Sequence, residues 1–268
     1  MALSTISELF DLTGKGAIVT GGGRGIGQAA SFRLAEAGAA VMVADIDTDS
    51  AGKTSEQIVA RGGKALHIRA DAKSTADAER VVDYTIEAFG SIDILVNNAG
   101  IFPYAPCLEV TEDIWNDVID INLKGLFFYS QAAARAMDRA GKGGKIINLA
   151  SIDSIKPTGM LVHYDASKGG VLMITKAMAK ELAPMKILVN AVAPGSIATP
   201  GVKDGMAAFG KVLGMTPEQI DAGFLQRVPL GRMGEPDDIA KVILFFASAA
   251  ADYITGEVIV IDGGYLLT

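Results

Sequence analysis

Seven short apolar runs alternate with longer amphipathic stretches along this sequence, and that alternation limits the possible folds most strongly. Several of the runs are apolar on consecutive positions, as strands are when helices cover both faces of a sheet. They lie at Ala17–Thr20, Ala40–Ala44, Ala65–Arg69, Ile92–Val96, Lys145–Leu149, Ile187–Val192 and Val258–Ile261. Helical patterns lie at Gly25–Ala37, Asp49–Arg61, Thr75–Phe89, Glu112–Arg139, Val162–Leu182 and Pro236–Ala250. The order predicts an α/β fold with a doubly wound, seven-stranded parallel sheet and helices on both faces.

No repeat, low-complexity tract or linker divides the 268 residues, so we expect a single domain over 1–268. The segment 195–226 interrupts the rhythm with glycines, prolines and scattered apolar residues. Such a segment is typical of a loop that closes over a substrate, or of a short helical insert that packs on the core. Both interpretations stay open, and the apolar side chains concerned are Met206, Phe209, Met215 and Phe224.

Charge and cysteine content exclude several classes of protein. The chain has 31 acidic and 24 basic residues and no basic cluster, which disfavours nucleic-acid binding. One cysteine, Cys107, forms no internal disulfide, and together with His67 and His163 it offers no metal-ligand cluster. The first twelve residues lack a signal-peptide pattern, and the apolar run Val242–Ala251 is half of the roughly 20 residues that span a bilayer. We therefore expect a cytoplasmic protein with neither membrane nor nucleic acid as its partner.

A glycine-rich turn, Thr20 to Gly27, directly follows the first apolar run and opens a helical pattern. Glycines at such a turn let a pyrophosphate approach free amides at a helix N-terminus. Its spacing places glycine at 21, 25 and 27, a Rossmann-type dinucleotide turn that differs from G-x-G-x-x-G. Asp45 ends the second run, where a carboxylate accepts from ribose hydroxyls and repels a 2′-phosphate. The sequence thus predicts NAD as cofactor, although Arg24 in the turn could meet a phosphate.

Two later segments fit the same site. Asp71 and Ala72 follow the third run, where the carboxylate could meet the adenine amino group or simply cap the helix that begins near Thr75. Asn97-Asn98-Ala99-Gly100 follow the fourth run, and small residues there leave room for a nucleotide across the strand ends. The alternative for this segment is an ordinary turn at the end of a strand.

Tyr164 and Lys168 lie four residues apart, on one face of a predicted helix, and Ser151 lies thirteen residues before Tyr164. Alone, such a Tyr-x-x-x-Lys pattern is an ordinary surface pair. Together with the strands, the glycine turn and Ser151, it resembles the short-chain dehydrogenase/reductase family in its single-domain form, from Gly14 through Gly264. Leu188 departs from the family's frequent arginine and puts one local salt bridge in doubt.

The resemblance implies a catalytic tetrad of Asn122, Ser151, Tyr164 and Lys168. Tyr164 would be the general acid/base, with its pKa lowered by the Lys168 ammonium, which would also bind the nicotinamide ribose. Ser151 would hold the substrate oxygen, and Asn122 would hold a water that relays protons from Lys168.

The resemblance also implies a cofactor site and an assembly. The cofactor would contact Gly21, Arg24, Gly25, Ile26, Gly27, Asp45, Asp71, Ala72, Asn98, Ala99, Gly100, Tyr164, Lys168, Pro194, Gly195, Ile197 and Thr199. Within this set, the stretch from Pro194 to Thr199 would hold the nicotinamide carboxamide. Relatives are commonly homotetramers that pair their two long helices, here Glu112–Arg139 and Val162–Leu182.

The sequence therefore predicts an NAD-dependent oxidoreductase that interconverts a secondary alcohol and a ketone. The alternatives are a reductase of 3-oxoacyl thioesters and an inactive nucleotide-sensing protein on the same fold. A Ser-His-Asp hydrolase is disfavoured because Ser151 has no G-x-S-x-G elbow. The expected substrate is neutral and moderately hydrophobic or cyclic, with a sugar or polyol also possible through Asp153, His163 and Ser196. The expected pocket walls are Ile101, Phe102, Tyr104, Ile152, Asp153, Met160, His163 and the loop after Gly195.

Overall fold

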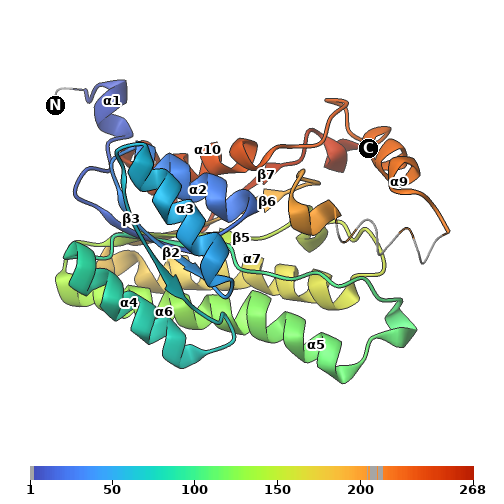
Figure 1. Ribbon diagram of the computed structural model, residues 1–268, viewed down its shortest axis with the longest axis horizontal. Coiled ribbons are helices and arrows are strands. Elements are labelled where there is room, and N and C mark those ends of the chain that lie inside the picture. Colours follow the sequence, from blue (N-terminus) through green and yellow to red (C-terminus); the bar gives the residue numbers. More distant parts are fainter. Residues whose placement is uncertain (1–2, 204, 206–209, 211–213) are drawn as a thin grey trace.

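The computed structural model describes residues 3–203, 205, 210 and 214–268, and its centre is one parallel sheet (Figure 1). The seven strands run in the order β3-β2-β1-β4-β5-β6-β7, and every neighbouring pair is parallel. The strands are β1 (Gly16–Thr20), β2 (Ala40–Asp45), β3 (Lys64–Arg69), β4 (Ile94–Asn97), β5 (Gly144–Leu149), β6 (Ile187–Pro194) and β7 (Val258–Ile261). This arrangement confirms the predicted fold class. The strand order reverses between β1 and β4, which opens a crevice at their carboxyl ends.

Helices cover both faces of the sheet (Figure 1). One face packs against α2 (Gly25–Glu36), α3 (Thr48–Ala60) and α10 (Pro236–Ala247). The other packs against α4 (Thr75–Phe89), α6 (Leu126–Ala140) and α7 (Val162–Leu182). Three further α-helices with bounds inside the described residues are α1 (Ile6–Leu9), α5 (Glu112–Ile119) and α9 (Pro217–Leu225). In the part of the chain that the structure describes, no helix is both long and apolar enough to cross a membrane.

β1 shows why the strands were recognisable in the sequence. Ala17 and Val19 enter the core beneath α2 and α10, whereas Ile18 points into the opposite core. All five residues of the strand are buried. Because both faces are dry, successive positions must all be apolar, and each buried aliphatic side chain contributes about 1.5–3 kcal/mol.

The predicted helix Glu112–Arg139 is not continuous. It is interrupted by a π-helical segment, Asp120–Gly125, between α5 and α6. A Cβ atom on Gly125 would overlap the carbonyl oxygen of Ala72, so the chain approaches a neighbouring backbone closely at this point. The prediction of one regular α-helix was therefore wrong at its middle, where the helix is wound as a π-helix. A π-helical insertion of this kind is frequent at functional sites.

Smaller differences lie at the ends of elements. β4 begins at Ile94 rather than Ile92, and β6 continues to Pro194 because its last residues pair with β7. The last long helix ends at Ala247, where Ser248 adopts an extended conformation and begins a separate short turn.

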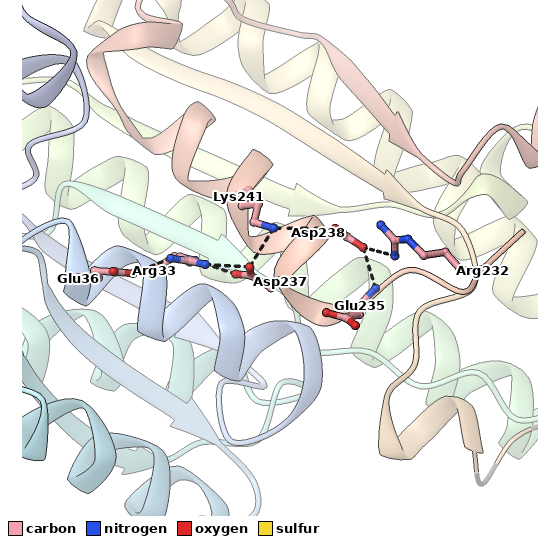
Figure 2. A network of polar contacts seen from close by, with 7 residues as sticks. All are labelled: Arg33, Glu36, Arg232, Glu235, Asp237, Asp238 and Lys241. Carbon is pink, nitrogen blue, oxygen red and sulfur yellow. Dashed lines mark hydrogen bonds and ion pairs between the residues drawn. The ribbon is translucent and has the colours of Figure 1, made fainter. Parts of the chain in front are cut away.

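A network of ion pairs joins α2 to α10 (Figure 2). The Arg33 guanidinium donates to both carboxylate oxygens of Asp237, at 2.7 and 2.8 Å, and to Glu36 at 2.7 Å. Lys241 lies 3.0 Å from the same Asp237 carboxylate. Arg232 donates to Asp238 at 2.7 Å, and so attaches the segment before α10 to the helix. The helix that follows the glycine turn is thus tied to the C-terminal part of the chain.

Replacing Asp237 by Asn tests this network. The Arg33 hydrogen bonds lower the pKa of Asp237 to about 2, so the carboxylate stabilises the fold above the unfolded pKa and loses its effect as pH falls through 2. Both side chains are about one third exposed, and with solvent screening we expect a cost of about 1 kcal/mol at pH 7 that shrinks below pH 4. Urea unfolding between pH 3 and 7 measures it. The control is Asp252→Asn, which breaks a pair with Lys145 and whose carboxylate is more exposed than that of Asp237. A cost for Asp237→Asn that does not vary with pH would contradict the assignment.

Candidate active site

Two adjoining cavities lie at the carboxyl edge of the sheet. The first has a volume of about 450 Å³ and extends along the ends of β1, β2 and β4. The second, of about 330 Å³, is enclosed by the residues after β5, by α9 and by the C-terminal segment. Both are lined by Phe102, Ser151, Tyr164, Gly195 and Val202. The two cavities therefore adjoin at these five residues, among which Ser151 and Tyr164 carry hydroxyl groups.

The glycine turn forms one end of the first cavity. Gly21 has a φ of 61°, in the left-handed region that favours glycine. A Cβ atom on Gly27 would overlap the carbonyl oxygen of Gly21, so the turn can close only without a side chain there. The Asn98 amide donates to the carbonyls of Thr20 and Gly21, at 3.0 and 2.9 Å, and fixes the turn. Free amides at the start of α2 and the absence of side chains fit a dinucleotide pyrophosphate.

All the cofactor residues predicted from the sequence line the first cavity except Gly27, which packs beneath the turn. Asp45 accepts from the backbone amides of Gly23 and Asp47, at 2.9 and 3.0 Å, which fixes its carboxylate at the cavity rim. Arg24 is paired with Asp47 and donates to Ser50 at 2.9 Å. The positive charge of Arg24 is thus partly offset by the Asp47 carboxylate, which no sequence motif marks.

Asp71 also lies on the first cavity, where its carboxylate accepts from the Lys73 amide at 2.9 Å. The N-cap of α4 is Ser74, whose hydroxyl accepts from the Asp77 amide at 3.1 Å. The alternative interpretation of Asp71 as the cap of that helix was therefore wrong.

Ser151, Tyr164 and Lys168 come together where the two cavities meet. Ser151 follows β5, while the other two lie on α7. The Lys168 ammonium lies 5.6 Å from the centre of the Tyr164 ring and donates to the carbonyl of Leu149 at 2.6 Å. Phe102 packs edge-on against the Tyr164 ring, with 5.9 Å between the ring centres. The structure thus brings a phenol, a hydroxyl and an ammonium to one place.

The electrostatics differ from the sequence expectation. Burial raises the pKa of Tyr164 above its ordinary value, and the hydrogen bond between Tyr164 and Ser151 opposes this only in part. Burial also lowers the pKa of Lys168 to about 8. The Lys168 ammonium donates to the carbonyl of Leu149, and removal from water disfavours a phenolate, so the lowering of the Tyr164 pKa by Lys168 stays a prediction.

Asn122 lies in the π-helical segment and is fully buried. Its amide oxygen accepts from the Ile101 amide at 2.9 Å, and its nitrogen donates to the Ile101 carbonyl at 2.8 Å and to Ser167 at 3.2 Å. The side chain therefore fastens the strand-end segment after Asn98 against α7. The role of Asn122 in holding a water for Lys168 stays a prediction. The contacts of its side chain give it a structural role, which is to fix the segment after Asn98 against α7.

The second cavity agrees with only part of the predicted pocket. Phe102, Tyr104, Ile152, Asp153 and Ser196 line it, whereas Ile101 lines the first cavity. Two predicted walls were wrong, because neither Met160 nor His163 lines either cavity. His163 is fully buried and its Nε2 atom lies 2.7 Å from the carbonyl oxygen of Pro103.

On the far wall of the second cavity, sequence reasoning had named Met215 and Phe224 but missed Arg227 and Tyr265. Tyr265 stacks on Phe224 of α9 at 4.9 Å, and the Arg227 guanidinium lies 4.6 Å from the centre of the Tyr265 ring. Figure 1 shows α9 and the C-terminus at the same end of the molecule. No motif marks these residues, and only their shared apolar or aromatic character signalled them. The segment 195–226 contributes Met215, Ile220 and Phe224 to the cavity, so its helical insert also forms a pocket wall. Met206 and Phe209 lie outside the described residues.

Comparisons with known proteins match nearly the whole chain. The family model described as Enoyl-(Acyl carrier protein) reductase matches residues 21–266. The 2-dehydro-3-deoxy-D-gluconate 5-dehydrogenase of Escherichia coli (strain K12) is 41% identical over 97% of this chain and 99% of its own length. The L-rhamnose 1-dehydrogenase (NAD(P)(+)) of Azotobacter vinelandii is 42% identical over 94% and 97%. A short-chain type dehydrogenase/reductase from Mycobacterium marinum superimposes with a TM-score of 0.91 at 40% identity, over 98% of this chain and all of that one.

The buried Lys168 makes a test of the site's electrostatics. The folded protein releases this proton near pH 8, whereas the unfolded chain keeps it to about 10.5, so the stability of the wild type should rise with pH between these values. Relative to a Lys168→Met variant, that gain should approach about 3 kcal/mol, at 1.36 kcal/mol for each pH unit. Chemical unfolding at pH 7, 9 and 10 measures it. Lys176→Met, on the exposed side of the same helix, should show no such pH-dependent difference. If the free energies of unfolding of wild type and Lys168→Met change with pH in the same way, burial does not lower the pKa of Lys168, and the assignment is wrong.

Proposed function

The chain belongs to the short-chain dehydrogenase/reductase family of oxidoreductases, and from this premise we propose that it is an NAD-dependent enzyme that interconverts a secondary alcohol and a ketone on a polyhydroxylated small molecule. The observation that carries the proposal is the meeting of two cavities at Ser151 and Tyr164. The first cavity has the length and the glycine turn that a dinucleotide needs. The second has the size of a small substrate.

The residues at this meeting point suit the proton chemistry of alcohol oxidation. A bound nicotinamide ring supplies the redox chemistry, accepting a hydride from the alcohol carbon or returning it to the ketone carbon. The hydroxyl proton must leave with the hydride, and Tyr164, as a phenolate, would accept it. In the reverse direction the Tyr164 phenol returns that proton to the carbonyl oxygen. Ser151 donates a hydrogen bond to the same oxygen and stabilises its developing charge.

Polar groups in the second cavity support a polyhydroxylated substrate. Asp153, Thr158, Ser196, Gln219 and Arg227 line it together with aromatic rings. The relatives whose printed names specify a sugar or a sugar acid support the same class. Of the substrates that the sequence left open, we therefore prefer a sugar, a polyol or a related hydroxy compound to a moderately hydrophobic or cyclic one.

The description of the matching family model favours a second candidate, reduction of an acyl thioester. Enzymes that reduce 3-oxoacyl thioesters usually use NADPH, and the Asp45 carboxylate at the cavity rim disfavours a 2′-phosphate. An inactive nucleotide-sensing protein is disfavoured because Ser151, Tyr164 and Lys168 are all present and close together.

We also propose that the enzyme acts in the cytoplasm as a homotetramer. Trp115 on α5 and Met173 on α7 are exposed large apolar side chains on the helices that would pair between subunits. Burial of these side chains in an interface would remove them from water.

Replacement of Asp45 tests the cofactor proposal. The wild type should have the higher kcat/KM with NAD, and Asp45→Ala should shift the NADP/NAD ratio of kcat/KM toward NADP by about tenfold or more, because a single charge repulsion is removed at the ribose. Asp45→Asn keeps an acceptor for the Gly23 amide and separates loss of charge from loosening of the turn. Initial rates with both cofactors decide the matter. A wild-type enzyme that already favours NADP would refute the role given to Asp45.

Replacement of Tyr164 by Phe tests the mechanism. The change removes only the phenolic oxygen, so we expect kcat to fall by about 10²-fold or more, while the melting temperature and the Kd for NADH stay unchanged. Tyr104→Phe removes a phenol from the same second cavity and should change kcat by less than tenfold. Stopped-flow or steady-state assays at saturating cofactor measure kcat. If Tyr164→Phe keeps most of its activity, Tyr164 is not the acid/base.

A further inference from the structure

The hydroxyl of Ser151 is hydrogen-bonded to a carboxylate within the second cavity. Ser151 Oγ donates to Asp153 Oδ2 at 3.0 Å, and the Asp153 amide donates back to Ser151 Oγ at 3.1 Å. A serine hydroxyl has a single proton to donate. Asp153 therefore competes for the very hydrogen bond that Ser151 must give to the reacting oxygen in the proposed reaction.

Asp153 cannot simply turn away from Ser151. Its other oxygen, Oδ1, accepts from the Thr158 amide at 3.0 Å and fixes the carboxylate across the loop. Among the residues that the structure describes, Asp153 makes no ion pair with a lysine, arginine or histidine. A partly buried carboxylate without a cationic partner depends on hydrogen-bond donors, and charge-assisted bonds to it are strong. Ser151 is one of its few donors.

The negative charge of Asp153 acts on its neighbours. Burial and, after it, the Asp153 charge raise the pKa of Asp165 to about 6, and the same two causes raise the pKa of Tyr104. The Arg227 guanidinium also lines the second cavity, where it lies over the Tyr265 ring, and Asp153 presents an acceptor on the cavity wall. A hydroxyl on a substrate is the donor that this wall would accept.

We propose that Asp153 is a specificity-determining residue that recognises a hydroxyl group on the carbon next to the reacting carbon. A substrate with this neighbouring hydroxyl donates its proton to Asp153 Oδ2 in place of Ser151. The Ser151 proton is thereby released to the reacting oxygen. The two oxygens of a vicinal diol lie about one hydrogen-bond length apart, as Ser151 Oγ and Asp153 Oδ2 do, so such a pair can bridge the two side chains.

The inference rests on the proposed function and makes it more specific. The substrate class becomes vicinal diols and α-hydroxy ketones, which includes sugars and polyols. A simple secondary alcohol offers no second donor, so its binding leaves either Asp153 or the reacting oxygen without a partner. Sites built around a substrate hydroxyl discriminate strongly against analogues that lack it, because a polar group is left unpaired.

A matched pair of substrates tests the inference. Butane-2,3-diol and butan-2-ol differ by one hydroxyl next to the reacting carbon, and cyclohexane-1,2-diol and cyclohexanol repeat the comparison in a ring. We expect the wild type to favour each diol by about 10²-fold or more in kcat/KM. Asp153→Ala should reduce this preference below tenfold, by slowing the diols and leaving the simple alcohols unchanged or faster. Asp153→Asn keeps an acceptor for the Thr158 amide and should give an intermediate preference. This variant separates the loss of the carboxylate charge from a change in the loop conformation.

The control is Asp165→Asn, which removes a nearby carboxylate of α7 that makes no contact with Ser151. It should keep the wild-type preference. An equal fall for both members of a pair in Asp153→Ala would show a structural role only, and an unchanged preference would show that Asp153 does not contact the substrate. Either result overturns the inference.

A binding measurement separates this inference from the proposed function. In Tyr164→Phe with NADH present, the Kd of 3-hydroxybutan-2-one should be about tenfold or more below that of butan-2-one, and the Asp153→Ala change should abolish the difference. NADH fluorescence reports both. If the wild type oxidises none of the alcohols but this binding preference is present, the proposed function fails and the role of Asp153 stands. If the binding preference is absent, the inference about Asp153 fails, whatever the enzyme oxidises.

Discussion

The whole site depends on the hydrogen bonds that join the ends of β1 and β4. The Thr20 hydroxyl accepts from the amides of Asn98 and Ala99, at 3.0 and 3.1 Å, while the Asn98 side chain donates back to Thr20 and Gly21. These strands are neighbours in the sheet, but two other strands, β2 and β3, lie between them in the chain. The strand order reverses between β1 and β4, so a crevice opens beyond their carboxyl ends, and these hydrogen bonds fix its two edges relative to each other. The same bonds fix the glycine turn, so the shape of the first cavity and the sheet topology have one physical cause.

A second set of buried polar contacts connects the end of β4 to α7. The Asn97 amide donates to Ser130 of α6 and to Asn148 of β5, at 2.8 and 2.9 Å, and the Asn148 amide donates to Thr175 of α7 at 3.0 Å. Polar groups with mutual partners in a dry core specify one arrangement, because any shift leaves a donor unpaired. These bonds thereby fix β4, β5, α6 and α7 in one relative position. Tyr164 and Lys168 project from the helix at the end of this chain of contacts.

The sequence predicted what depends on local pattern and failed where distant segments meet. The strands were recognisable because burial on both faces forces apolar residues at successive positions, and the glycine turn because Gly21 and Gly27 leave no room for a side chain. The π-helical segment was missed because no local pattern marks it, and the close approach of Gly125 to the backbone of Ala72, some fifty residues away, exists only in the fold. His163 was misplaced because only the fold brings Pro103 to its ring. The contact between Arg227 and Tyr265 likewise has no signal in either segment alone.

Burial sets the resting protonation of the site as well as its shape. It raises the pKa of Tyr164 and lowers that of Lys168, since low polarity disfavours charge on either group. Tyr164 is therefore a phenol at neutral pH, the form that would donate a proton to a ketone. Alcohol oxidation would need that proton to leave first, which requires an ammonium close to the phenolic oxygen and hence a Lys168 side chain turned away from Leu149. The anion of Asp153 nearby opposes phenolate formation, so a substrate hydroxyl that binds this carboxylate would assist the acid/base as well as release Ser151.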